Sequence, residues 1–292
     1  MPDGARVTPS AQAPVLLITG ASSGIGKSAA LEIGEAGGTM LLVARRADQL
    51  QEVADEIADL GGVAYVHRCD LTDMDDIDRM AREVLEQHET VDVLVNNAGK
   101  SIRRSVDRAY ERFHDYQRTM QLNYFAAVKL ILDLLPTMRE RNSGHIVNIS
   151  TIGLQMNTPR FSAYVASKAA LDAFSRSIGP EVINDGVHIT TVYMPLVRTP
   201  MIAPTKIYDR FPTLSPDEAG HMIAEAIRKR PKRIATALGS LGQLTYAIAP
   251  GAQDLLVNRA YHLIPEGDQK QPDHEPTAEE RAFVRATRGV HW

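Results

Sequence analysis

The chain has 292 residues, of which 44% are hydrophobic and 23% are charged, and its formal net charge at pH 7 is -4. This length allows a large core in one domain, and the mixed charges argue against nucleic acid as the main partner. The single cysteine, Cys69, excludes an intramolecular disulfide and a multi-cysteine metal site, and it suits a reducing cytoplasm.

The N-terminal stretch 1–13 is rich in Pro, Ser and Gly and lacks the basic start and long apolar run of a secretory signal. We expect it to be a flexible leader. No segment has the roughly 18 uninterrupted apolar residues of a spanning helix, so we expect a cytoplasmic protein that does not cross a membrane.

Short runs rich in Val, Ile and Leu alternate with longer amphipathic stretches. Buried strands that alternate with helices indicate a parallel sheet covered on both faces. The sequence therefore predicts a Rossmann-type, doubly wound α/β domain over 14–264. The strands are expected at 14–19, 39–44, 63–67, 91–96, 144–150 and 187–194.

Three later segments are expected to serve the substrate or to leave the domain. A substrate lid is predicted at about 196–225, and an apolar helical segment, interrupted at Pro250, at about 237–264. Residues 265–292 are polar and rich in Pro, which predicts a tail with a short final helix.

The first predicted strand runs into the glycine-rich turn TGASSGIG. Glycines let the backbone approach a pyrophosphate, and the first amides of the following helix point their positive end at it. The spacing is G-x-x-x-G-x-G, and a tight turn without a ligand is the alternative reading. The residues expected at the cofactor are Gly20, Ser22, Ser23, Gly24, Ile25 and Gly26.

Arg45 and Arg46 follow the second predicted strand, where an NAD-binding fold usually has an acidic residue for the ribose 2′-hydroxyl. A guanidinium suits the extra phosphate of NADP instead. We expect Arg45 to bind that phosphate and Arg46 to support it, against the alternative of a solvated turn. The next two strand ends place Asp70 and Leu71 at the adenine edge, followed by Asn97, Ala98 and Gly99.

Tyr164 and Lys168 lie one helical turn apart in RFSAYVASKAALDAF. Such a pair can be an ordinary surface contact. A free phenol has a pKa of about 10, however, so a phenol that exchanges protons near neutrality needs a nearby cation.

The motifs TGASSGIG, CDL, NNAG, Asn123, IVNIST and Y-x-x-x-K run in order from residue 19 to about 200, and together they resemble the short-chain dehydrogenase/reductase family. The resemblance implies that Tyr164 is the general acid/base and that Lys168 lowers its pKa and binds the nicotinamide ribose. It also implies that Thr151 orients the substrate carbonyl, and that Asn123 holds a proton-relay water.

Two positions depart from the family pattern. Thr151 stands 13 residues before the tyrosine, where the family has serine, and it keeps the hydroxyl but adds a methyl group. Ser150 is expected to face away, because adjacent strand residues point to opposite faces. Leu196 follows Pro195 where the family usually has glycine, yet Pro195, Val197 and Thr199 are still expected at the nicotinamide side.

Stretches such as RFHDYQRTMQLNYFAAVKLILDLLP and YMPLVRTPMIAPTKIYD resemble the bacterial NADPH-dependent fatty acyl-CoA reductases of this family. The resemblance implies reduction of a long-chain acyl-CoA to a fatty aldehyde by direct hydride transfer, with NADP(H) as cofactor. It also implies a homo-oligomer, a dimer or a tetramer. A route through a cysteine nucleophile is rejected, because Cys69 lies at the adenine side.

Other basic and apolar segments have more than one interpretation each. Arg103 and Arg104 could attract the phosphates of CoA or lie in a solvated loop, and 228–233 could contact CoA or anionic lipid or simply end a helix. The apolar segment could hold the acyl chain, contact a membrane peripherally or bind a second subunit. The alternative activity is an NADP-dependent ketone or alcohol oxidoreductase acting on a lipid or steroid. A non-catalytic NADP-binding regulator is a third hypothesis, which the complete set of Asn, Thr, Tyr and Lys opposes.

Overall fold

The computed structural model of the chain describes residues 13–202 and 212–263. Seven parallel strands form one sheet in the order β3-β2-β1-β4-β5-β6-β7, which confirms the predicted doubly wound fold. The strands are β1 (Val15–Thr19), β2 (Thr39–Ala44), β3 (Val63–Arg68), β4 (Val93–Asn96), β5 (Gly144–Thr151), β6 (Val187–Met194) and β7 (Arg233–Ile234).

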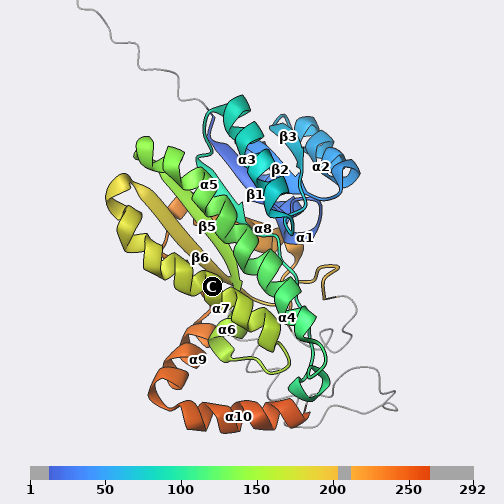
Figure 1. The fold of residues 1–292 in the computed structure, drawn as a ribbon, viewed down its shortest axis with the longest axis vertical. Coiled ribbons are helices and arrows are strands. Elements are labelled where there is room, and N and C mark those ends of the chain that lie inside the picture. Colours follow the sequence, from blue (N-terminus) through green and yellow to red (C-terminus); the bar gives the residue numbers. More distant parts are fainter. Residues whose placement is uncertain (1–12, 203–211, 264–292) are drawn as a thin grey trace, which may run out of the picture.

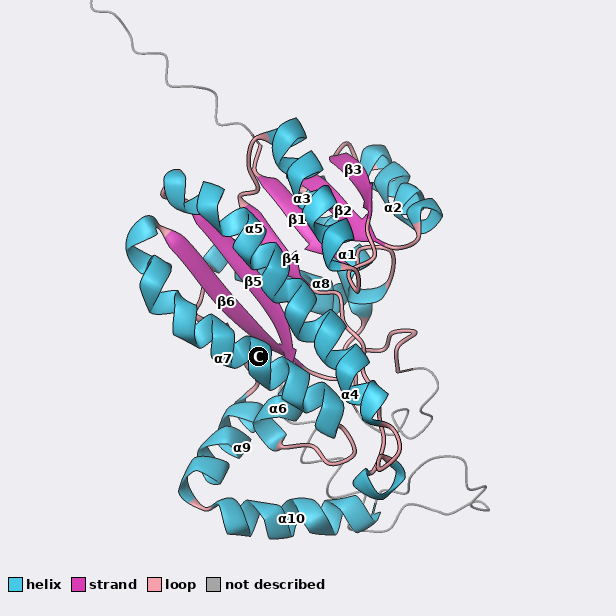
Figure 2. Cartoon of the chain, in the orientation of Figure 1, coloured by secondary structure: helices cyan, strands magenta, loops and turns pink. Residues whose placement is uncertain are grey.

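Helices cover both faces of the sheet (Figures 1 and 2). Apolar residues of α1, α2 and α8 form one core against the sheet, and those of α3, α5 and α7 form a second core on the other face. Burial of both faces explains why the strands are almost continuously apolar. These helices are α1 (Gly24–Glu35), α2 (Ala47–Asp59), α3 (Met74–His88), α5 (Ala126–Glu140), α7 (Ser162–Val182) and α8 (Pro216–Lys229).

The remaining helices gather toward the carboxyl ends of β5 and β6 (Figure 1). They include α4 (Phe113–Met120), α6 (Ile152–Met156), α9 (Ala237–Ile248) and α10 (Pro250–Leu263). Short 3-10 turns lie at Val106–Arg108, after β4, and at Ile183–Asp185, just before the amino end of β6. The apolar segment thus forms two helices that meet at Pro250. None of the helices in the described part of the chain has the length and apolar character to cross a membrane.

Three of the predicted segments fall partly or wholly outside the described residues. The leader and the polar tail lie there, apart from residue 13, and so does the stretch 203–211 of the predicted lid. The end of that predicted lid belongs to α8, which begins with a capping box of Ser215 and Glu218 and packs on α1.

Candidate active site

A cavity of about 970 Å³ opens at the carboxyl ends of the central strands. Ligands of open α/β sheets bind at this edge, where the order of the strands reverses. All the residues predicted at the cofactor, except Gly26, line this cavity, together with Thr151. The structure therefore brings the predicted cofactor and catalytic positions to one place, although Asn123 does not line the cavity.

The three glycines of the glycine-rich turn are required for two different physical reasons. Gly20 and Gly24 have φ of +70° and +56°, in the left-handed region that favours glycine. At Gly26, a Cβ would lie 2.4 Å from the backbone oxygen of Gly20, so only glycine fits behind the turn. Ser23 precedes α1 without a side-chain capping bond, and no acidic residue occupies the first turn. The first amides of α1 are therefore suited to an anionic group.

Asn97 fixes this turn to the end of β4. Its side-chain amide donates to the backbone oxygen of Thr19 at 2.9 Å, and the backbone N–H groups of Asn97 and Ala98 donate to Thr19 Oγ1 at 3.0 Å. A Cβ on Gly26 would lie 2.5 Å from the same amide. Asn97 thus positions the glycine-rich turn besides lining the cavity.

Arg45 and Arg46 lie exposed at one end of the cavity, after β2. Asp70 lies at the same end and accepts hydrogen bonds from the backbone and the hydroxyl of Thr72. The bond from the Thr72 backbone, with help from the charge of Arg45, lowers the pKa of Asp70. Two guanidiniums and one ionised carboxylate therefore give this end a surplus of positive charge.

Lys168 is buried, with an exposed fraction of 3%. Its Nζ donates to the backbone oxygen of Ile149 on β5 at 2.6 Å. Burial lowers the pKa of this ammonium from 10.5 to about 8. A cation at the floor of the cavity is thus held by the sheet, one helical turn from Tyr164.

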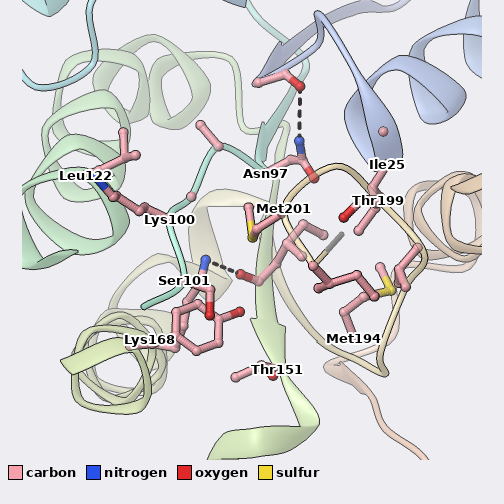
Figure 3. A pocket seen from close by; sticks show the side chains of 18 of the residues that line it. Ile25, Asn97, Lys100, Ser101, Leu122, Thr151, Lys168, Met194, Thr199 and Met201 are labelled. Carbon is pink, nitrogen blue, oxygen red and sulfur yellow. Dashed lines mark hydrogen bonds between the residues drawn. The ribbon is translucent and has the colours of Figure 1, made fainter. Parts of the chain in front are cut away.

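Tyr164 is half-buried in the first turn of α7 and lines the cavity, and its ring packs edge-on against Phe161. Thr151, at the end of β5, lies on the same side of the cavity as Lys168 (Figure 3). Its hydroxyl accepts a hydrogen bond from the backbone of Gly153 at 3.1 Å, so the side chain also begins α6. An accepting oxygen of this kind keeps its own hydrogen for a substrate carbonyl.

Ser150 differs from Thr151 as the alternation of a strand requires. Its hydroxyl oxygen is fully buried and has no hydrogen-bond partner among the described residues, although the residue contributes to the cavity wall. Thr151 is half-buried and therefore the better placed of the two hydroxyls.

Asn123 lies in a π-helical turn, Gln121–Phe125, between α4 and α5. Its Nδ2 donates to the backbone oxygen of Lys100 and to Ser167 Oγ, both at 2.9 Å, and its Oδ1 accepts from the Lys100 backbone at 2.8 Å. Turns of this kind are frequent at functional sites. Here the turn aims a buried amide at the loop behind the cavity wall.

The segment after β6 makes its turn without strain. Leu196 is not among the described residues with positive φ, and its backbone pairs with Leu214 at 2.9 Å. A Cβ on Gly24 would lie 3.2 Å from Thr199 Cγ2. Thr199 therefore faces the glycine-rich turn, beside Ile25 and opposite Lys100 and Leu122 (Figure 3).

Cys69 is fully buried, and this burial raises the pKa of its thiol to about 12. The thiolate is the nucleophilic form of cysteine, so this residue is poorly suited to form a thioacyl-enzyme. Sequence analysis did not single out Lys100 and Arg118, which also line the cavity. Lys100 directly follows the NNAG motif, which is the signal that could have identified it.

The model of the short chain dehydrogenase family matches residues 14–207, which is more than half of the chain. The chain therefore belongs to the short-chain dehydrogenase family, whose members are NAD(P)-binding oxidoreductases. It is 54% identical to a fatty acyl-CoA reductase of Acinetobacter baylyi over 95% of each chain. It is 47% identical to a fatty acyl-CoA reductase of Mycobacterium tuberculosis, over 84% of this chain and 83% of the relative.

Solved structures give the same picture of the fold. A short-chain dehydrogenase from Streptomyces avermitilis is 31% identical, with a TM-score of 0.72, over 86% of this chain and 98% of that one. A metagenomic short-chain oxidoreductase in complex with NADP is 28% identical, with a TM-score of 0.64, over 76% of this chain and 97% of that one.

Proposed function

We propose that the protein reduces long-chain fatty acyl-CoA to fatty aldehyde and free CoA with NADPH. The observation that carries this proposal is the 54% identity to a fatty acyl-CoA reductase over 95% of the chain, a span that includes the segments after β6. Similarity confined to the dinucleotide half would support the cofactor alone.

The residues of the cavity fit NADP(H) as the cofactor. Gly20, Gly24 and the first amides of α1 would hold the pyrophosphate, and Lys168 would bind the ribose next to the nicotinamide. Arg45, with Arg46, would bind the 2′-phosphate, because a guanidinium pairs with phosphate through two parallel hydrogen bonds. When bound, NADPH supplies the hydride for the reduction.

The catalytic roles follow from the chemistry of the three side chains in the cavity. Thr151 donates its hydroxyl hydrogen to the thioester oxygen, and Tyr164 donates a proton to the same oxygen as negative charge develops. The Lys168 ammonium lowers the pKa of the phenol by its positive charge. The resulting hemithioacetal collapses to aldehyde and CoA thiol, so no acyl-enzyme is needed.

Asn123 acts by positioning in this scheme. Its three hydrogen bonds fix the backbone of Lys100 and the hydroxyl of Ser167, and Ser167 donates in turn to the backbone oxygen of Tyr164 at 2.7 Å. A relay water, as the family resemblance implies, would be placed by the backbone that Asn123 holds.

The test is NADPH oxidation with palmitoyl-CoA as sole acceptor, while thiol and aldehyde are followed in parallel. We expect thiol and aldehyde in equal amounts, and we expect Tyr164→Phe to abolish both while NADPH binding is retained. NADPH binding without thiol release would refute the proposal. Turnover of long-chain ketones or alcohols in that case would establish the alternative oxidoreductase activity.

We propose further that the protein is cytoplasmic and contacts membranes peripherally through α9. Leu241, Leu244 and Ile248 share one face of this helix and are 61%, 56% and 74% exposed. The helix has no charged residue, while Arg233, at the end of the basic run 228–233, donates to Ser240 Oγ at 3.3 Å. An apolar face beside cations suits an anionic lipid surface, where a long-chain substrate also partitions.

Flotation with vesicles that contain anionic lipid tests this proposal. We expect the wild-type protein to float and Leu244→Asp to remain in solution, while Leu60→Asp, which changes an exposed leucine after α2, floats as the wild type does. Flotation that Leu244→Asp leaves unchanged would contradict the assignment to α9.

The homo-oligomer implied by the family stays a proposal as well. Phe125 and Leu132 stand seven residues apart, at the start and in the middle of the helical segment that includes α5, and both are about half exposed. We propose that this face lies in a contact between two copies of the chain. Light scattering after gel filtration should give a dimer or tetramer mass, and a monomer mass would refute it.

A further inference from the structure

The end of the cavity that is formed by the loop after β4 and by α4 carries cations of its own. Lys100 and Arg103 lie in the loop after β4, and Arg118 lies near the end of α4. Among the described residues that line the cavity, Asp70 is the only acidic one, and the charge of Arg45 acts on it. The end formed by the loop after β4 and by α4 therefore presents positive charge that the dinucleotide fold does not explain.

One carboxylate, Asp115, holds Arg118 together with two arginines that do not line the cavity, Arg104 and Arg112. The Asp115 side chain is 3% exposed and accepts hydrogen bonds from Arg118 and, at 3.0 Å, from Arg104 Nε, while Arg112 Nε lies 3.5 Å away and His114 at 3.4 Å. Three guanidiniums around one negative charge leave a positive surplus. Arg118 keeps 51% of its side chain exposed and lines the cavity.

The structure also distinguishes Arg103 from Arg104, to which sequence analysis assigned the same two interpretations. Arg104 pairs with Asp115 and does not line the cavity, whereas Arg103 does line it. The backbone N–H of Arg104 donates at 2.6 Å to the oxygen of Arg160, just before α7. The cation-bearing loop is therefore fixed relative to the helix that carries Tyr164.

Lys100 is fixed in the same way, because Asn123 binds both its backbone N–H and its backbone oxygen. Figure 3 shows Lys100 beside Leu122, across the cavity from Thr199 and Ile25. The cavity volume of about 970 Å³ is close to the upper end of the range of about 300–1,000 Å³ for ligand pockets. The cavity lining extends beyond the residues expected at the dinucleotide, to Lys100, Arg103 and Arg118.

We propose that Lys100, Arg103 and Arg118 bind the phosphate groups of the CoA part of the substrate. This inference rests on the proposed function for the identity of the substrate. CoA carries a pyrophosphate and a 3′-phosphate, and guanidiniums recognise phosphate through paired hydrogen bonds while lysine acts as a point charge. Binding of the phosphates at this end orients the thioester toward Tyr164 and Thr151.

The first measurement is titration calorimetry of CoA into protein saturated with NADP⁺, in lipid-free buffer. We expect Arg118→Gln to weaken CoA binding by about tenfold, the loss expected for one hydrogen-bonded charge. Arg228→Gln is the matched control. Arg228 also pairs with a carboxylate three residues earlier, Glu225, and is 63% exposed, but it does not line the cavity.

Kinetics with two thioesters separate phosphate recognition from a general effect on the site. Arg118→Gln and Lys100→Gln should each raise the KM for palmitoyl-CoA by about tenfold and leave the KM for palmitoyl-pantetheine, which has no phosphate, unchanged. Equal losses with both thioesters would mean that these residues act on the fold of the site, and the proposal would fail. Inorganic phosphate at millimolar concentration should compete only weakly with CoA, and equal competition would mean a site for a single phosphate.

The binding measurement also separates this inference from the proposed reaction. CoA binding that depends on Arg118, together with no reduction of any thioester, would refute the reductase activity and leave the phosphate site in place. Thioester reduction that Arg118→Gln and Lys100→Gln do not change would refute the phosphate site alone. Absence of CoA binding to the wild-type protein would refute the site whatever the reaction.

Discussion

The buried ammonium of Lys168 should make the stability of the protein depend on pH in a defined window. Its pKa lies at about 8 in the folded chain because burial removes water from the charge, against 10.5 for an exposed lysine. Between these two values the unfolded chain retains a proton that the folded chain has released. Stability therefore rises with pH in this window, because the unfolded state binds more protons there.

The size of the effect follows from the two pKa values. One pH unit corresponds to about 1.4 kcal/mol, so the difference between 10.5 and about 8 corresponds to about 3 kcal/mol in the free energy of unfolding. Below pH 8 both states hold the proton and the full cost of burying the charge is present. Above pH 10.5 both states have lost the proton, and the free energy of unfolding has risen by the full amount.

The assay is urea unfolding at several pH values from 7 to 10.5, for the wild type and for Lys168→Met. Other groups titrate in this range, and all of them except the phenol of Tyr164, which responds to the Lys168 charge, cancel in the difference between the two free energies. From pH 8 to 10.5 we expect the free energy of unfolding of the wild type to rise by about 3 kcal/mol relative to that of Lys168→Met. Lys229→Met, which changes an exposed lysine, should show no such trend.

A difference between the wild type and Lys168→Met that stays flat from pH 8 to 10.5 would refute the reasoning. It would mean that the ammonium keeps its proton in the folded chain, and that the hydrogen bond to the Ile149 oxygen compensates for its burial. In that case the cation would be available to Tyr164 throughout this range of pH.

Three further predictions follow from the cavity and from the packing around it. Arg45→Ala should raise the KM for NADPH about tenfold and leave that for NADH unchanged, because only NADPH carries the 2′-phosphate, and equal effects would contradict the assignment. Gly220→Ala should lower the free energy of unfolding in urea by about 1–3 kcal/mol, because its Cβ would lie 2.8 Å from the backbone nitrogen of Ala29. Gly251→Ala is the control, since a Cβ there would meet open space in α10, and it should raise the free energy of unfolding by up to about 1 kcal/mol. Cys69 should resist iodoacetamide at pH 8 in the folded protein and react in urea, since burial raises its pKa to about 12, and rapid labelling of the folded protein would refute this.

The sheet was predictable because each strand is short, apolar and followed by a helix. The expected and observed strands differ by two residues at most, as at 91–96 against Val93–Asn96. The same holds for the glycine-rich turn, since the positive φ of Gly20 and Gly24 is a local property of the backbone. Such features depend on neighbours in the sequence, and a single sequence contains them.

The rest of the site depends on contacts between distant segments. The π-helical turn at Asn123 adds one residue to a helical turn, and no hydrophobic periodicity marks it. The cluster around Asp115 brings Arg104 from a loop to two arginines of the α4 region. Sequence analysis could weigh Arg103 and Arg104 only as equals, because which of them finds the buried carboxylate is decided by tertiary packing.

Asn123 belongs both to the features that the sequence predicts and to those that depend on contacts between distant segments. Its amide joins the loop after β4 to α7 through Lys100 on one side and Ser167 on the other, and Ser167 continues to the backbone of Tyr164. Loss of the Asn123 amide would leave buried donors and acceptors of both partners unpaired, which costs more than the bonds themselves contribute. The residue that the family motif identifies as catalytic is therefore, in this fold, also the one that ties the loop after β4 to the helix that carries Tyr164.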